Sequence, residues 1–208
     1  MKTIASYIIF GTMALTVASC SDGWLDVEPS TAVETDKSIN ELSDVNIMLN
    51  GIYTTMQDAY AYSGRLVYYG DACGDDMMAY SSTKRTGNYY TFNFTKDTAP
   101  STFWSYPYKM IGLCNIILAK IDNLETKETE LRDYYKGQAL ALRAMLLFDL
   151  TKFYGYPYKK DNGASLAVPI VTTVLDKEAN PKRNTVAECY SQVIADLKAA
   201  VAAMDNDE

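Results

Sequence analysis

The residues best suited to chemistry lie between positions 70 and 90, where carboxylates, an arginine and tyrosines occur close together. Asp75 and Asp76 are adjacent, and Tyr80, Arg85 and Tyr89 follow them. Two carboxylates can act as acid and base in glycoside hydrolysis, and carboxylate oxygens also bind Ca²⁺. Adjacent side chains seldom point at one bond from opposite sides, and the ligand spacing of a calcium loop is missing. The pair is better explained as a turn cap, with calcium as the weaker alternative, so we predict neither a catalytic residue nor a metal site.

The composition of the chain excludes several classes of function. The 208 residues contain no histidine, which removes the commonest general base and the commonest zinc ligand. A net charge of −7 without a long basic block argues against a nucleic-acid partner. Nothing in the sequence calls for a cofactor. The four cysteines form no Cys-x-x-Cys pair, and a disulfide among Cys73, Cys114 and Cys189 stays open.

The first 19 residues have the layout of a secretory signal peptide. Lys2 precedes an apolar run from Ile4 to Val17 that is too short to remain as a membrane span. The residues that end in Cys20 resemble the lipobox of bacterial lipoproteins, which implies acylation of Cys20 and a lipid anchor; an ordinary signal peptide with a chance cysteine is the alternative. Ser21-Asp22 resembles the surface-export signal of Bacteroidota lipoproteins. Residues 20–37 then read as a tether to a body spanning residues 38–208.

Elements that could position these residues are predicted to be helices. The strongest apolar periodicity runs from Leu131 to Phe153 and predicts a helix of about 25 residues, which Gly155 and Pro157 bring to an end. A capping box at Thr185 opens another helix that reaches Met204. Since long amphipathic helices need cover, these two must pack on others.

Two more helices are predicted upstream, separated by a long connection. A capping box at Ser38 and Glu41 opens the first of them, which runs to about Tyr60. The second starts at residues 101–104 and ends near Asn123, with its regular part beginning near Pro107. A short charged turn places it antiparallel to the long helix that follows. The fold class is therefore all-α, with about four main helices.

The connection formed by residues 61–100 has no sustained period, apart from one short hairpin predicted at 88–93. The stretch from Tyr53 to Tyr108 nevertheless holds more than half of the aromatic side chains of the chain. An irregular connection so rich in aromatic residues is more typical of a functional segment than of a disordered one. A second extended segment, at 166–171, is restricted by Pro169 to a sheet edge or to coil packed on the helices.

Several motifs occur in an order that resembles the N-terminal half of the SusD/RagB family. They are Trp104-x3-Tyr108-x2-Ile111-x3-Asn115, Gln138-Ala139-x2-Leu142-Arg143-Ala144-x3-Phe148, Tyr154-Gly155-x-Pro157, Val168-Pro169, and Arg183-x-Thr185-x2-Glu188-x-Tyr190. The resemblance implies tetratricopeptide-like helix pairs. It also implies an outer-membrane lipoprotein that captures oligosaccharide beside a TonB-dependent, SusC-like transporter and performs no catalysis. Family members usually continue for several hundred residues beyond the part matched here.

The resemblance implies a glycan site in the aromatic connection. There Tyr80 is the expected stacking residue, Asp76 and Arg85 are the expected hydrogen-bond partners, and Tyr89 is a second platform. Aromatic faces stack on the C–H faces of sugars, while charged groups bond to hydroxyls. Alternatives are that these tyrosines pack on the helices, or that the chain is a tetratricopeptide-like protein-binding scaffold or a non-functional fragment without a sugar site. Arg143, on an apolar helix, is predicted to be a structural tie to an acidic group or helix end.

Overall fold

The computed structural model describes residues 38–74, 77–80, 87–95, 97 and 101–205. Within these ranges, four long helices hold about half of the residues, and there is no β-strand beyond a single bridge between Leu166 and Thr185. The long helices are α2 (Leu42–Met56), α5 (Thr102–Lys120), α6 (Thr129–Tyr154) and α7 (Val186–Met204). The prediction of an all-α fold with about four main helices is confirmed. No helix in the described ranges is long and apolar enough to cross a bilayer.

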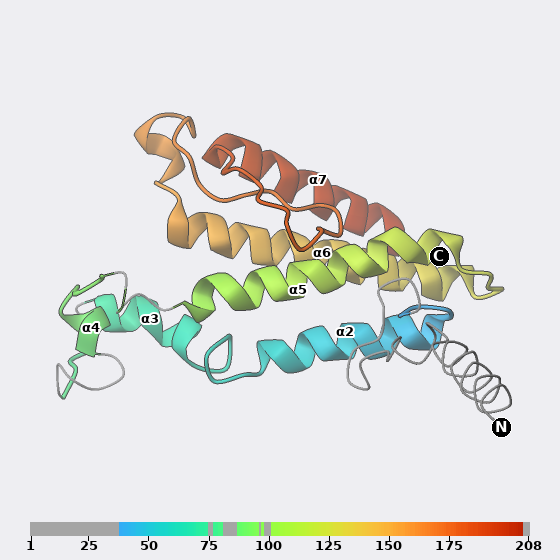
Figure 1. Cartoon of the computed structure of the whole chain (residues 1–208), viewed down its shortest axis with the longest axis horizontal. Helices are drawn as coiled ribbons and strands as arrows, with labels where there is room; N and C mark the ends of the chain where they lie inside the picture. Colours follow the sequence, from blue (N-terminus) through green and yellow to red (C-terminus); the bar gives the residue numbers. More distant parts are fainter. Residues whose placement is uncertain (1–37, 75–76, 81–86, 96, 98–100, 206–208) are drawn as a thin grey trace, which may run out of the picture. The chain divides into compact units, whose positions relative to one another are not determined.

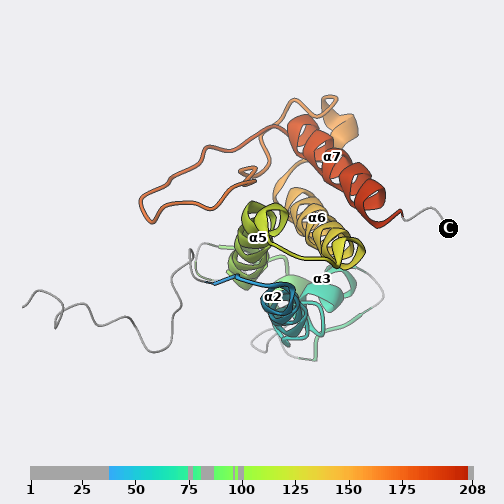
Figure 2. The ribbon, with the colours of Figure 1, turned by 90° about the vertical axis from the view of Figure 1, so that its right-hand side faces the viewer.

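The four helices lie in sequence order, each packed on the next (Figures 1 and 2). Helix α5 lies between α2 and α6, and α7 covers the other side of α6. Helices α6 and α7 run antiparallel: Gly137, in the first half of α6, lies against Met204 at the end of α7, while Gly155, just after α6, lies against Val186 at the start of α7. This arrangement is the helix-pair architecture that the sequence predicted.

Helix α6 is the centre of the core, as its periodicity indicated. It has 26 residues, and side chains on it that are fully or almost fully buried recur every three or four positions. These are Ala139, Leu142, Leu146 and Leu150. On its two sides α6 meets Ile117 and Ile121 from the α5 segment and Val186 and Val193 from α7, within one hydrophobic cluster. The prediction of a long central helix that ends at Gly155 is confirmed.

Two predicted helix starts have different outcomes. At α7, Thr185 caps the helix: its hydroxyl accepts from the backbone N–H of Glu188 at 3.2 Å, and the Glu188 carboxylate accepts from the backbone N–H of Thr185 at 2.7 Å. At α2, the predicted box at Ser38 is wrong by one turn. There the Asp44 carboxylate accepts from the backbone N–H of Glu41 at 3.1 Å, and the helix begins at Leu42.

The expectation that α5 becomes regular only near Pro107 is also wrong. The helix begins at Thr102, and the backbone N–H of Ser105 already donates to the carbonyl of Ser101 at 3.0 Å. Proline at the sixth position removes one helical hydrogen bond. Its ring is buried, as is Phe103 one turn before it, so packing holds the turn together despite the missing bond.

The region 61–100 contains two helices that the sequence did not predict. These are α3 (Arg65–Cys73) and the single turn α4 (Gly87–Tyr90). The hairpin predicted at 88–93 is therefore wrong. Tyr90, Phe92 and Phe94 alternate with polar residues as in a strand, but the ring of Tyr89 is buried against other aromatic rings and the local backbone closes into a helical turn.

The segment between α6 and α7 includes the 3-10 turn η4 (Tyr158–Lys160) and a long irregular stretch that extends beyond the helices in Figure 2. Ala167 and Val168 are buried, and the hydroxyl of Tyr108 donates to the carbonyl of Pro169 at 2.7 Å. Of the two predicted alternatives for residues 166–171, a sheet edge or coil packed on the helices, the structure shows the second.

Candidate functional site

A buried ion pair fixes the helices that support the aromatic region. The Nε and one terminal nitrogen of Arg143 donate to the two carboxylate oxygens of Asp196 at 2.8 and 2.7 Å. The other terminal nitrogen donates to Asn115 at 2.9 Å and to the carbonyl of Thr172 at 3.2 Å. Arg143, Asp196 and Asn115 are all buried. The prediction that Arg143 is a structural tie is confirmed, because its donors engage three elements of the chain and leave no free arm for a ligand.

The same cluster holds the base of the extended coil. The Asn115 amide donates to the carbonyls of Val171 and Thr173, at 3.0 Å each. With the bond from Arg143 to the carbonyl of Thr172, two buried side chains donate hydrogen bonds to three consecutive carbonyls. The sequence showed that Asn115 is on the buried face of its helix, but it gave no indication that Asn115 holds this coil.

Two tyrosines anchor the beginning of the aromatic region on α6. The Tyr53 hydroxyl donates to the side-chain oxygen of Gln138 at 2.8 Å, and the Tyr62 hydroxyl donates to Asp149 at 2.7 Å. Burial and the neighbouring carboxylate raise the pKa of Tyr62 above its usual range, so it remains a neutral donor. These bonds hold the end of α2 and the approach to α3 against the central helix.

Tyr89 lies inside an aromatic cluster, which differs from the prediction that it is a stacking platform. Its ring centroid lies 5.2 Å from Tyr69, 6.2 Å from Phe94 and 6.3 Å from Phe103. Only 4% of Tyr89 is exposed. The ring is covered because the α4 turn directs it toward α3 and α5, so it offers no face to a sugar in this structure.

Tyr80 lies at the opposite extreme of exposure. It is as exposed as in an extended peptide, at 102%, and Met77 and Met78 on the same short segment are exposed as well. Asp75, Asp76 and Arg85 lie outside the described residues. The structure therefore places one of the four predicted contact residues at the surface and one in the core, and the grouping of the four remains a prediction.

Other exposed aromatic side chains in this region were missed by the sequence analysis. Phe92 is 65% exposed and Phe94 is 40% exposed. Tyr60 is 42% exposed, with the Arg65 guanidinium 4.1 Å above its ring. The alternation of Tyr90, Phe92 and Phe94 with polar residues is a signal in the sequence that could have pointed to the first two.

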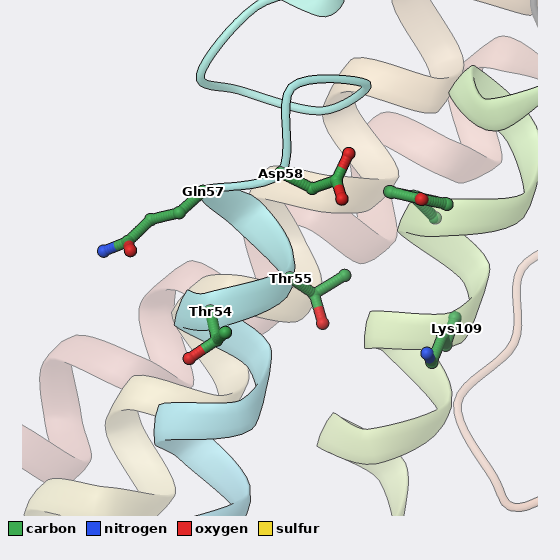
Figure 3. Close-up of a pocket in the computed structure, with 6 residues that line it drawn as sticks. Thr54, Thr55, Gln57, Asp58 and Lys109 are labelled. Atoms are coloured by element: carbon green, nitrogen blue, oxygen red, sulfur yellow. The ribbon is translucent and has the colours of Figure 1, made fainter.

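A shallow hollow lies between the end of α2 and α5 (Figure 3). Its volume is about 470 Å³, and its lining residues are Thr54, Thr55, Gln57, Asp58, Tyr106 and Lys109. The hydroxyls of Thr54 and Thr55 donate to carbonyls of their own helix at 2.8 and 2.9 Å, and Gln57 points away from Asp58 and Lys109. Most of the lining residues are of polar type, but their side chains do not converge on one point.

The described residues contain no arrangement typical of acid–base or metal chemistry. No group of three or more cysteines and carboxylates in this part of the chain is placed to hold a metal ion. The carboxylates with a shifted pKa, Asp161 and Glu188, both have it lowered, chiefly by hydrogen bonds from Ser165 and from the backbone N–H of Thr185. A general acid needs the opposite shift, so these two groups act as caps.

Comparison with known proteins identifies the family of this fold. The sequence model of a SusD-like family, described as starch-binding and associating with the outer membrane, matches residues 23–208. No curated protein matches the chain.

Solved structures give the same answer. The chain is 61% identical to a Bacteroides vulgatus protein assigned as sugar binding, with a TM-score of 0.77 over 80% of this chain and 38% of that one. It is 35% identical to a SusD superfamily protein of Bacteroides thetaiotaomicron, with a TM-score of 0.71 over 78% of this chain and 37% of that one. A second Bacteroides vulgatus protein of this superfamily is 31% identical, with a TM-score of 0.76 over 82% and 39%. The chain thus spans about two fifths of the length of these structures, and it belongs to the SusD-like family.

Proposed function

We propose that this chain is the N-terminal helical part of a non-catalytic protein that binds oligosaccharides at the cell surface. The observation that carries the proposal is the family match over residues 23–208, to a family described as starch-binding. The 61% identity to a protein assigned as sugar binding supports it at closer range. In physical terms, the fully exposed ring of Tyr80 suits the C–H face of a sugar.

Within this proposal, Tyr80 is the stacking residue, and Asp76 and Arg85 supply hydrogen bonds to the sugar hydroxyls. Tyr89 supports the site from the core, since its ring packs on Tyr69 and Phe94. The helical body then serves as a rigid base for a recognition segment between α3 and α5.

The proposed location is the outer face of the outer membrane. Residues 1–19 would be removed as a signal peptide, Cys20 would carry the lipid, and residues 20–37 would act as a tether. The proposed partner is a TonB-dependent, SusC-like transporter that receives the captured oligosaccharide. The family description as associating with the outer membrane supports this location.

An alternative function is that of a protein-binding scaffold without a sugar site. The observation that favours it is a row of exposed apolar side chains on the outer face of α7, formed by Ile194, Leu197 and Val201. Rows of this kind are typical of surfaces that contact another protein segment. A scaffold would bind protein partners and would leave a glycan array blank.

Calorimetry with a panel of oligosaccharides, led by maltoheptaose, tests the proposal. We expect Tyr80→Ala to weaken binding roughly 3- to 10-fold, because it removes one aromatic face. Tyr134→Ala is the matched control, since this tyrosine is 49% exposed on α6. A panel without any binding, or equal losses in both variants, would contradict the proposed role of Tyr80.

The partner and the anchor are tested separately. Co-purification from membranes of the native host should recover a TonB-dependent transporter, and Cys20→Ser should release the protein from the membrane fraction. Recovery of the Cys20→Ser protein in the membrane to the same extent as the wild type would contradict the lipid anchor.

A further inference from the structure

The exposed residue Phe92 holds an unusual backbone position at the end of α4. The backbone N–H of Phe92 donates to the carbonyl of Tyr89 at 3.1 Å, and that of Asn93 donates to the carbonyl of Asn88 at 2.9 Å. These are the two bonds of the Schellman motif that ends many helices. The residue between the cap and Asn93 must be left-handed in this motif, and Phe92 accordingly has a φ of 53°.

Glycine usually occupies this position, with asparagine as the second choice, because a Cβ is unfavourable there. A phenylalanine is among the less suitable residues for it. Glycine does occur nearby in the sequence, at Gly87. The aromatic ring of Phe92 is therefore placed at a position where the local backbone would be more stable with a different residue, which is typical of functional positions.

The ring is not placed there to fill the core. Phe92 is 65% exposed, and its one ring contact among the described residues is with Phe94, at 6.4 Å and nearly perpendicular. Burial therefore does not compensate for the unfavourable backbone.

Behind Phe92 lies a series of packed aromatic rings. Phe94 stacks on Tyr89 at 6.2 Å with an angle of 22°, and Tyr89 meets Tyr69 edge-on at 5.2 Å. Tyr69 in turn contacts Phe103 at 5.3 Å, and Phe103 is buried on α5. A continuous series of rings thus connects the core to the exposed ring of Phe92, which fixes its direction before any ligand arrives.

We propose that Phe92, supported by Phe94, is a preformed stacking platform for one glucose-configured unit of an oligosaccharide. A phenylalanine ring has no hydroxyl, so it can recognise a sugar only through its C–H face. A glucose ring offers such a face through its axial C–H bonds, and the family description as starch-binding makes a glucose unit the first candidate. The inference rests on the proposed glycan-binding function and adds a residue and a sugar configuration to it.

Substitutions at Phe92 can test the contribution of its ring separately from that of its left-handed backbone. Phe92→Asn removes the ring but suits the left-handed backbone, so the turn should be kept or stabilised. Phe92→Tyr keeps the ring. Tyr156→Asn is the matched control, because Tyr156 is 58% exposed and lies beyond the end of α6, outside the series of rings behind Phe92.

The experiment is calorimetry of the full chain with maltoheptaose and cellohexaose, together with thermal unfolding of each variant. We expect Phe92→Asn to weaken glucan binding roughly 3- to 10-fold without lowering the Tm. Phe92→Tyr and Tyr156→Asn should bind within about twofold of the wild type.

Several results would overturn the inference. One is unchanged glucan binding by Phe92→Asn, and another is weaker binding together with a clearly lower Tm, which would assign the ring to the fold. Absence of binding to either glucan would also overturn it. If another sugar binds and only Tyr80→Ala weakens that binding, the proposed function stands and the role of Phe92 alone is lost.

Discussion

Arg143 illustrates how one buried charged residue can fix the arrangement of several elements of a fold. Its guanidinium is buried and forms a two-pronged pair with Asp196, as well as bonds to Asn115 and to the carbonyl of Thr172. A buried pair contributes little net stability against an apolar replacement, but removal of one partner leaves the other charge unpaired. The cluster therefore fixes the geometry of α5, α6, α7 and the coil.

We expect Arg143→Ala to lower the free energy of unfolding by about 3–5 kcal/mol, because Asp196 would remain buried without a counter-charge. Arg143→Lys should recover only part of the loss, since lysine lacks the planar fork. Urea unfolding of the two variants measures both changes in the free energy of unfolding. Arg132→Ala is the control: its pair with Asp133 is partly exposed, so a change of at most about 0.5 kcal/mol is expected. Equal losses at the two arginines would contradict this account.

Cys73, Cys114 and Cys189 differ in exposure, which predicts different rates of alkylation. Cys73, Cys114 and Cys189 are free thiols, which answers the question of a disulfide among them. Burial raises the pKa of Cys73, an effect that a hydrogen bond with Tyr69 partly offsets, and burial raises the pKa of Cys114 to about 12.

Because the thiolate is the reactive form, a raised pKa means slower alkylation at neutral pH and a rate that keeps rising above pH 9. In the unfolded chain the rate should level off near the ordinary thiol pKa of about 8.5. Iodoacetamide labelling with peptide mapping should find Cys73 modified before Cys114 and Cys189, which are fully buried. Faster labelling of Cys114 than of Cys73 in the folded protein would be inconsistent with the structure.

At the scale of elements, the close packing of α6 and α7 depends on a residue without a side chain. A Cβ at Gly137 would collide with the Met204 side chain and lie 3.0 Å from the carbonyl of Ala200. Gly51, in α2, has open space around the corresponding position. The two glycines therefore predict opposite effects of the same substitution.

Gly137→Ala should destabilise the protein by about 1–3 kcal/mol through overpacking. Gly51→Ala should stabilise it by about 0.5–1 kcal/mol, since alanine is the better helix former at an exposed site. Thermal unfolding of the two variants gives the comparison. A stabilised Gly137→Ala protein would show that α7 lies farther from α6 than described.

The elements that could be predicted correctly from the sequence are those whose signals are local and repeated. The periodicity of α6 and the Thr185 capping box are of this kind, and both are confirmed. The start of α2 was placed one turn early because Ser38 is a favoured N-cap residue and Glu41 is not, whereas the helix begins where Leu42 and Val45 are buried. A local sequence pattern carries no information about this tertiary packing.

The candidate site was less predictable for the same reason. Tyr80 and Tyr89 look alike in the sequence, yet one is fully exposed and the other buried. What separates them is contact with Tyr69 and Phe103, which come from α3 and α5. A hairpin was predicted at 88–93, but the helical turn that forms there buries the ring of Tyr89 among other aromatic rings. Side-chain exposure in an irregular segment depends on these distant partners.

At the scale of the whole molecule, the proposed function gives the helices and the segment between α3 and α5 separate tasks. Helices α2, α5, α6 and α7 form the packed body (Figure 1), and the exposed aromatic side chains Tyr80 and Phe92 lie on the segment that connects α3 to α5. The body can therefore stay constant while the connection changes with the ligand, which suits a family of binding proteins. The matched structures are about two and a half times as long as the part they share with this chain.

The most direct test of the central claim combines binding with recovery of the ligand. The purified protein is titrated with maltoheptaose and the other oligosaccharides of the panel by calorimetry, and the sugar is then recovered and sized by chromatography. We predict reversible binding of at least one oligosaccharide, weakened by Tyr80→Ala, with the sugar recovered at its original length. A protein that binds no member of the panel, or that shortens the sugar it binds, would contradict the account.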